Sequence, residues 1–267
     1  MKYSVLAAVL LVSLASANGA TDNLNTVVTT DDYITVTPGP VWSGPLAEMY
    51  NNGPWWNSAG SGVGGADESI LETWGNTYGW GCQFGYDNVI ADDFVIPAGE
   101  TWDITAITVA GYQTGSTTTP TVNGLRLVCY DDQPPTGTMV YGDYTTNVFS
   151  SAVWSGIYRV NEAGSGTTSN RPIMAVTANL SSAWTLSEGT YWIAYQLDGS
   201  LSSGPWTPPI VIMGTQVTGN GLQSLDAGVS WAPAVTGADL QQGFPMIIEG
   251  DLVALQRSTW GEIKTVF

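Results

Sequence analysis

The sequence predicts an all-β protein that folds as an antiparallel two-sheet sandwich of jelly-roll type. Helical periodicity is nearly absent from the chain, and short runs rich in β-branched and aromatic residues alternate with glycine, proline, asparagine and aspartate. About 250 residues follow an N-terminal leader, a length that suits one large sandwich. Roughly ten short strands of this kind need two packed sheets to bury their apolar faces.

The chain opens with a pattern that is typical of a secretory signal peptide. Lys2 supplies a positive charge, residues 5–14 are apolar, and Ala15-Ser16-Ala17 places small residues at a cleavage site. The apolar run is shorter than the roughly 20 residues that span a membrane, although a buried helix is an alternative interpretation. We expect a secreted or cell-surface bacterial protein without a transmembrane segment.

The expected elements follow in chain order. Strands are predicted at residues 33–37, 90–96, 102–112, 122–130, 149–160, 173–180, 189–197, 210–214 and 244–250. Residues 51–85 are rich in glycine, tryptophan and asparagine, and they look too irregular for regular structure. We expect a signal peptide at 1–17, an N-terminal strand and Gly/Trp-rich segment packing on the sandwich at 18–86, the sandwich at 87–251, and a short tail at 252–267.

Charge excludes several functions. The chain has 6 Lys plus Arg, 23 Asp plus Glu and no histidine, giving a formal net charge of −17. A chain this acidic is a poor partner for nucleic acid, which needs clustered cations. Without histidine there is no Ser-His-Asp triad and no imidazole-ligated metal.

The two cysteines suggest one disulfide. In an exported chain, Cys82 and Cys129 most simply bond to each other. The length of the loop that this bond would close predicts roughly 4 kcal/mol of stabilisation. Two free, buried thiols are the alternative.

A cluster of carboxylates precedes and enters the strand at 90–96. Asp87, Asp92 and Asp93 lie within seven residues, and calcium takes oxygen ligands from such groups. We therefore expect calcium as a candidate cofactor here. The alternative is a structural role, in which the aspartates bind backbone donors or the arginines of the sandwich.

Tryptophans provide the candidate ligand-binding residues. Exposed indoles stack on sugar rings, so glycan binding is predicted at a set of five: Trp55, Trp56, Trp74, Trp80 and Trp206. The polar side chains of Asn51 and Asn57 are available to bind hydroxyl groups. The alternative is that the Gly/Trp-rich segment buries its indoles to hold itself on a sheet.

The order of motifs resembles a group of exported bacterial β-sandwich domains of largely unassigned function. The resemblance rests on Ala91-Asp92-Asp93-Phe94 at the start and on Pro245-Met246-Ile247-Ile248-Glu249-Gly250, a P-x-x-I-E-G pattern, at the end. Between them come Gly111-Tyr112-Gln113 and Gly189-Thr190-Tyr191-Trp192. The resemblance covers residues 87–250 and implies a secreted or surface domain, without a catalytic motif to carry over.

These observations favour an exported, non-enzymatic module that binds a glycan or surface polymer, with calcium as a candidate stabilising ion. The first alternative is a structural subunit of an extracellular fibre, in which residues 26–37 pair with the open sheet edge of another copy in self-association. The second is a glycan-active enzyme that uses two carboxylates, although no sequence motif identifies a catalytic pair among the glutamates.

Overall fold

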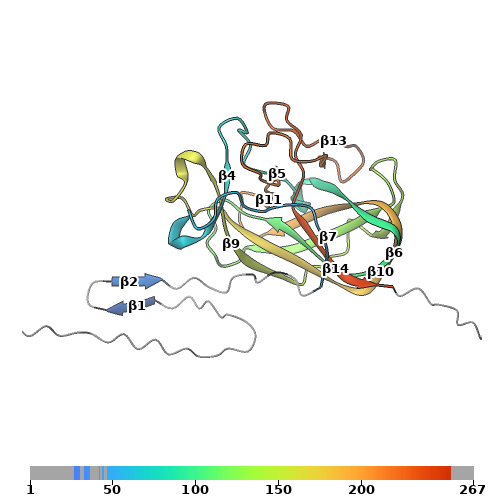
Figure 1. Ribbon diagram of the computed structural model, residues 1–267, viewed down its shortest axis with the longest axis horizontal. Coiled ribbons are helices and arrows are strands. Elements are labelled where there is room, and N and C mark those ends of the chain that lie inside the picture. Colours follow the sequence, from blue (N-terminus) through green and yellow to red (C-terminus); the bar gives the residue numbers. More distant parts are fainter. Residues whose placement is uncertain (1–26, 31–32, 37–41, 43, 45–46, 254–267) are drawn as a thin grey trace, which may run out of the picture.

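The computed structural model describes residues 27–30, 33–36, 42, 44 and 47–253 (Figure 1). Regular structure in this part of the chain is almost entirely β-strand, which confirms the predicted all-β class. None of these residues forms a helix long and apolar enough to cross a membrane. The predicted signal peptide at 1–17 and residues 254–267 of the predicted tail lie outside the described residues.

Ten strands form the main sheet. Its longest path runs in the order β13-β12-β6-β10-β7-β8; off this path, β14 pairs with β6 and β3, and β9 pairs with β10 and β4. The strands are β3 (Glu48–Asn51), β4 (Asp67–Leu71), β6 (Val89–Gly111), β7 (Val122–Tyr130), β8 (Met139–Gly142), β9 (Ser151–Asn161), β10 (Pro172–Gly199), β12 (Leu222–Ser224), β13 (Ala232–Pro233) and β14 (Met246–Leu252).

Two long strands organise this sheet. The strands predicted at 90–96 and 102–112 are the two halves of β6, and those predicted at 173–180 and 189–197 are the two halves of β10. The two strands pair antiparallel, and their register shifts between Asn179 and Trp184 and again between Ser187 and Gly189. Each pair of predicted strands is therefore one continuous strand, and the residues predicted as turns between them lie at these irregularities.

A shift of register at Thr105 exchanges the two faces of β6. Ile104 pairs with Gly250 of β14 and Ala106 with Glu249, so Thr105 is an extra residue on β6. Side chains alternate along a strand, so the insertion moves the core-facing set from even to odd positions. Ile104 and Ile107 accordingly share the main core, whereas Ala110 faces a second apolar cluster on the other side of the sheet.

The second cluster positions the candidate site. It contains Ile157 of β9, Ile173 and Ala175 of β10, and Ile247 of β14, all of which face away from the main core. Trp55, from the segment between β3 and β4, covers it. The Gly/Trp-rich segment is therefore packed on an outer face of the sheet.

Three details of the predicted strands were wrong. β4 pairs with β9 in parallel register, so the sheet is mixed and not purely antiparallel, and regular structure lies within residues 51–85. The strand predicted at 210–214 is a loop. Its backbone N–H groups donate to separate segments, from Ile210 to Gly243 and from Val211 to Pro54, so no continuous ladder forms.

Two small sheets complete the described structure. β1 (Val27–Thr30) and β2 (Tyr33–Val36) pair antiparallel in a sheet of their own, and β2 confirms the strand predicted at 33–37. β5 (Trp80–Gly81) pairs with β11 (Trp206–Thr207).

Candidate functional site

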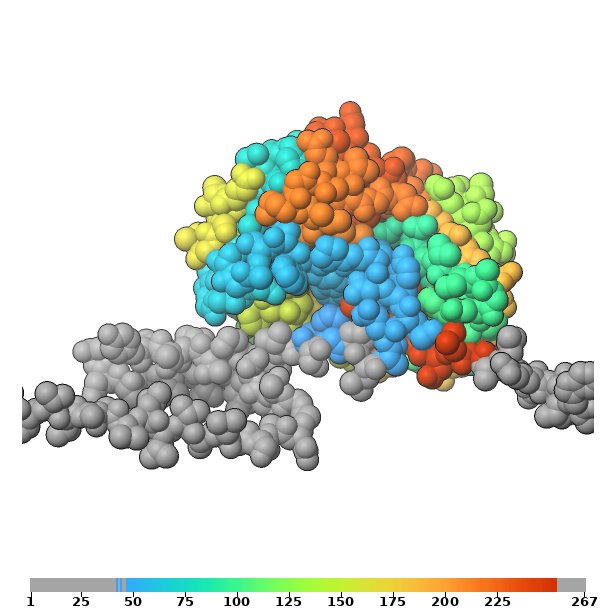
Figure 2. Space-filling model, viewed as in Figure 1, coloured from blue at the N-terminus to red at the C-terminus, as the bar shows by residue number. Residues whose placement is uncertain are grey.

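Three tryptophans meet around one hollow of about 320 Å³. Trp42, Trp55 and Trp56 form its aromatic walls, and we call this place the tryptophan hollow. Its other lining residues come from β3, β4, β9, β14 and the segments on either side of β3, namely Gly44, Asn51, Gly53, Pro54, Asp67, Ser155, Ile157 and Ile247. The blue segment after β3 lies on the face of the molecule displayed in Figure 2.

The two adjacent indoles have different environments. Trp55 is 6% exposed and packs on the outer apolar cluster, whereas Trp56 is 42% exposed. The ring of Trp42 stacks on that of Trp55 with centroids 5.3 Å apart and planes inclined by 17°. The hollow therefore combines a fixed stack with one indole that faces solvent.

The backbone around Trp55 and Trp56 is held on both sides. Gly53 has φ +149°, and a Cβ atom there would lie 2.8 Å from Cγ2 of Ile210, so a side chain would be obstructed. On the other side, Asn57 binds the backbone of Ile70 twice. Its Oδ1 accepts from Ile70 N–H at 2.8 Å and its Nδ2 donates to Ile70 O at 3.1 Å.

Polar groups border the aromatic walls. Asp67 Oδ1 accepts a hydrogen bond from Gly60 N–H at 2.8 Å, and Ser155 Oγ donates to Ile173 O at 2.7 Å. Asn51 Nδ2 lies 3.4 Å from Glu48 Oε2. Trp55 Nε1 is buried and has no hydrogen-bond partner among the described residues. An aromatic surface with carboxylate, amide and hydroxyl groups at its edge suits a ligand with an apolar face and polar edges.

A buried carboxylate next to Asp67, that of Glu68, holds two loops together. Glu68 accepts hydrogen bonds from Ser165 Oγ at 2.6 Å, Gly166 N–H at 2.9 Å and Ser61 Oγ at 2.7 Å. Burial raises the pKa of Glu68, but these three hydrogen bonds outweigh that effect, so the pKa lies below its ordinary value. Glu68 therefore joins the segment after Trp56 to the loop after β9.

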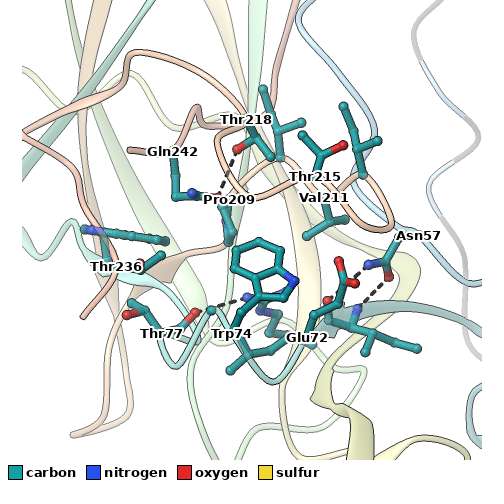
Figure 3. Close-up of a pocket in the computed structure, with 17 residues that line it drawn as sticks. Asn57, Glu72, Trp74, Thr77, Pro209, Val211, Thr215, Thr218, Thr236 and Gln242 are labelled. Carbon is teal, nitrogen blue, oxygen red and sulfur yellow. Dashed lines mark hydrogen bonds between the residues drawn. The ribbon is translucent and has the colours of Figure 1, made fainter. Parts of the chain in front are cut away.

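The five predicted binding tryptophans do not form one row. Trp55 and Trp56 line the tryptophan hollow, whereas Trp74 and Trp80 line a second, narrower pocket with Glu72, Thr218 and Gln242 (Figure 3). Trp80 is buried in the main core, where its ring meets that of Phe244 edge-on at 5.4 Å. Trp206 is partly buried against the outer cluster. Trp55 and Trp80 are therefore buried, as the alternative interpretation of the Gly/Trp-rich segment predicted.

Asp67 and Ser155 were not predicted as site residues, and Trp42, though part of the tryptophan-rich third of the chain, was not among the predicted ligand-binding residues. Asp67 begins a strand that has no clear alternation, so its place beside the indoles was not predictable. The signal for Trp42 was its position in the same tryptophan-rich third of the chain.

The predicted calcium ligands Asp87, Asp92 and Asp93 do not form a metal-binding group among the described residues. Asp87 is exposed at the end of a 3-10 turn, and Asp92 is buried, where its Oδ2 accepts from Phe244 N–H and from Asn52 Nδ2. The described residues hold no group of three or more acidic or cysteine side chains placed to bind a metal. Calcium binding stays a prediction, and a melting curve that a chelator leaves unchanged would contradict it.

The predicted Cys82–Cys129 disulfide is absent, because both cysteines are buried free thiols. Cys82 O accepts from Leu197 N–H on one edge of β10, whereas Cys129 pairs with Ile193 on the other edge. Four residues along a strand cover about 13 Å, which exceeds the reach of a disulfide. Burial raises the pKa of the Cys129 thiol to about 12.

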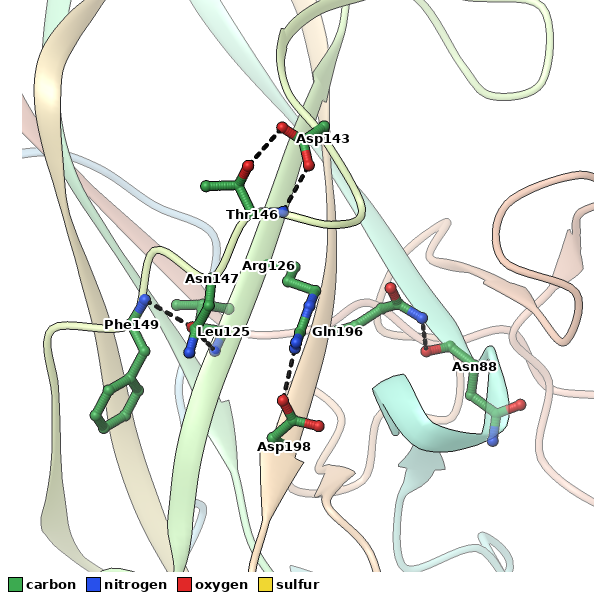
Figure 4. A network of polar contacts seen from close by, with 9 residues as sticks. All are labelled: Asn88, Leu125, Arg126, Asp143, Thr146, Asn147, Phe149, Gln196 and Asp198. Atoms are coloured by element: carbon green, nitrogen blue, oxygen red, sulfur yellow. Dashed lines mark hydrogen bonds and ion pairs between the residues drawn. The ribbon is translucent and has the colours of Figure 1, made fainter.

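A polar network lies on the outer face of β7 and β10 (Figure 4). Arg126 Nη1 and Asp198 Oδ2 form an ion pair at 2.7 Å, and the guanidinium stacks over the ring of Phe84 at 3.3 Å. Gln196, paired with Arg126 across the sheet, donates to Asn88 O at 3.2 Å. These contacts secure the turn of residues 84–88 and bring no further carboxylate to Arg126.

Comparison of the chain with models of protein families, with curated proteins and with solved structures gave no match.

Proposed function

We propose that this protein is an exported, non-enzymatic β-sandwich module that binds a glycan through the tryptophan hollow. The observation that carries the proposal is the meeting of Trp42, Trp55 and Trp56 around one hollow whose rim is polar. A volume of about 320 Å³ is near the lower end of the usual range for ligand pockets and suits one or two sugar rings.

The chemistry of the hollow supports a carbohydrate ligand. The exposed ring of Trp56 offers a flat apolar surface to the C–H face of a pyranose. Asn51, Asp67 and Ser155 provide donors and acceptors for hydroxyl groups at the ring edge. The stacking of Trp42 on Trp55 restrains both rings, which lowers the entropy lost when a ligand binds.

We also propose that the main sheet folds into a two-layer sandwich of jelly-roll type. Its support is that β6 and β10 both change register near their middles, and both halves of each strand supply residues to the main core. Phe94 and Ile107 of β6, for example, lie in the same cluster. A sheet bent over itself in this way encloses one core between two layers.

We propose binding without hydrolysis because of the composition of the hollow. Asp67 is the one carboxylate among its described lining residues. The usual glycosidase mechanisms need two carboxyl groups on either side of the scissile bond. Release of reducing ends from a bound glycan would overturn this part of the proposal.

Immobilised oligosaccharides test the proposal. We expect the full chain to bind at least one class of glycan, and Trp56→Ala to weaken that binding about five- to 150-fold, because loss of a stacked aromatic contact is worth about 1–3 kcal/mol. Tyr86→Ala is the matched control, because Tyr86 is an aromatic residue that is 72% exposed and lies outside the hollow. Equal binding by both variants would contradict the proposed site.

A structural subunit of an extracellular fibre is the second candidate. The observation that favours it is that β1 and β2 form a sheet separate from the ten-stranded sheet, so the outer edges of this hairpin have no partner strand among the described residues. Unpaired edges are templates for strand addition. Ultracentrifugation of the chain lacking residues 1–17 tests this. Growth of large assemblies that removal of residues 18–37 prevents would support the fibre, and a monomer at all concentrations would contradict it.

A further inference from the structure

The tryptophan hollow has a negative electrostatic character. Asp67 is the charged side chain among its described lining residues, and no lysine or arginine lines it. A second carboxylate, Glu48, lies next to the rim, where its Oε2 is 3.4 Å from Asn51 Nδ2. The whole chain also carries a formal net charge of −17. The local and the overall potential therefore have the same sign.

Asp67 is held in place with one oxygen available. Its Oδ1 accepts from Gly60 N–H at 2.8 Å, and Oδ2 has no hydrogen bond with the described residues. The backbone of Asp67 is fixed by parallel pairing of β4 with β9, which sets Asp67 opposite Ile157 on the floor of the hollow. The side chain is half-buried, so its charge is less screened than that of a fully exposed carboxylate.

We propose that the hollow selects sugars that carry a protonated amine, of the glucosamine class, over neutral sugars and over acidic glycans. This inference rests on the proposed glycan-binding function. An ammonium group beside Asp67 forms a charge-assisted hydrogen bond with Oδ2. The same cation is attracted to the faces of the neighbouring indoles, and Trp binds cations best among the aromatic side chains. Uronic acids and sulfated sugars would instead place like charges beside Asp67 and Glu48.

Two oligomers that differ at the amine test the inference. Glucosamine hexamer and N-acetylglucosamine hexamer have the same backbone, but acetylation removes the charge. Binding is measured by calorimetry at about pH 6, where the amine is protonated. We expect the full chain to bind the glucosamine hexamer about three- to tenfold more tightly at low salt, and we expect added salt to reduce this preference.

Asp67→Asn is the informative variant, because the asparagine Oδ1 can still accept from Gly60 N–H. We expect this variant to lose most of its preference for the glucosamine hexamer, while Asp132→Asn, the same charge change at an exposed turn outside the hollow, keeps the preference.

The outcomes separate the two proposals. Equal or tighter binding of the N-acetylated hexamer by the unmodified chain overturns this inference and leaves glycan binding in place. An undiminished preference in Asp67→Asn also overturns it. Binding of neither hexamer nor any other glycan overturns the proposed function itself. If Asp67→Asn fails to fold, the comparison of the two hexamers on the unmodified chain and its dependence on salt still decide the question.

Discussion

Trp55 and Trp56 are neighbours in sequence, but they should contribute very differently to stability. Trp55 is 6% exposed and covers the outer cluster, whereas the ring of Trp56 is 42% exposed to solvent. We predict that Trp55→Ala lowers the free energy of unfolding by about 3–5 kcal/mol and that Trp56→Ala lowers it by less than about 1 kcal/mol. Urea unfolding measures both values, and similar losses for the two variants would contradict this packing.

Asp92 should make stability depend on pH. Burial raises the pKa of Asp92 to about 7, although hydrogen bonds from the N–H groups of Phe244 and Asp93 oppose this rise. Because the folded protein holds the proton more tightly than the unfolded chain, the Asp92 contribution to stability is most favourable below about pH 4 and is lost as pH rises towards 7. The difference corresponds to roughly 4 kcal/mol.

The Asp92→Asn variant isolates this effect from other carboxylates. Its side chain cannot ionise, yet its oxygen can still accept from Phe244 N–H. We predict that the stability of the unmodified protein relative to Asp92→Asn decreases from pH 4 to pH 7, as measured by urea midpoints at several pH values. A constant difference over this range would show that Asp92 does not have a raised pKa.

At the scale of elements, β4 is attached through the buried guanidinium of Arg159. Its Nη1 donates to Ser69 O at 3.2 Å and Nε donates to Tyr78 O at 2.7 Å. Burial lowers the pKa of Arg159 to about 10, which still leaves it charged at neutral pH. We predict that Arg159→Met costs about 3 kcal/mol, because buried carbonyl groups lose their donor. Thermal unfolding tests this.

Arg171→Met is the control for that experiment. The guanidinium of Arg171 lies 4.1 Å from the ring centroid of Tyr78, and its Nη1 donates to Oδ1 of the adjacent Asn170 at an exposed site. We expect a loss below about 1 kcal/mol. An equal loss for the two variants would contradict the role of Arg159 in holding β4.

Strands with a clear apolar pattern were predictable, and those held by long-range contacts were not. Residues 122–130 were predicted with the observed limits of β7, because apolar side chains occupy both of its faces. β4 was missed because Asp67, Glu68 and Ser69 look like a loop in sequence. The strand forms because its polar side chains find partners in the folded chain. The carboxylate of Glu68 accepts from Gly166 N–H, and the hydroxyl of Ser69 accepts from Arg159. The gathering of Trp42, Trp55 and Trp56 depends on the same packing, so the sequence showed the residue type but not the site.

At the scale of the whole molecule, stability should not depend on redox conditions. Cys82 and Cys129 are free and buried. We predict that a reductant leaves the melting temperature unchanged, and that both thiols react with an alkylating agent only after denaturation. Intact mass measurement counts the alkylated thiols. A melting temperature that falls by several degrees on reduction would show that a disulfide exists in solution.

The central claim is that a glycan binds at the tryptophan hollow, and NMR of the tryptophan indole N–H groups tests it most directly. The buried Trp80 and Trp102 serve as internal references within the main core. During titration with a bound oligosaccharide, we predict that the signals of Trp42, Trp55 and Trp56 shift while those of Trp80 and Trp102 stay in place. Shifts confined to Trp74 and Trp80, or no shifts at a saturating concentration of a ligand that binds, would contradict the account.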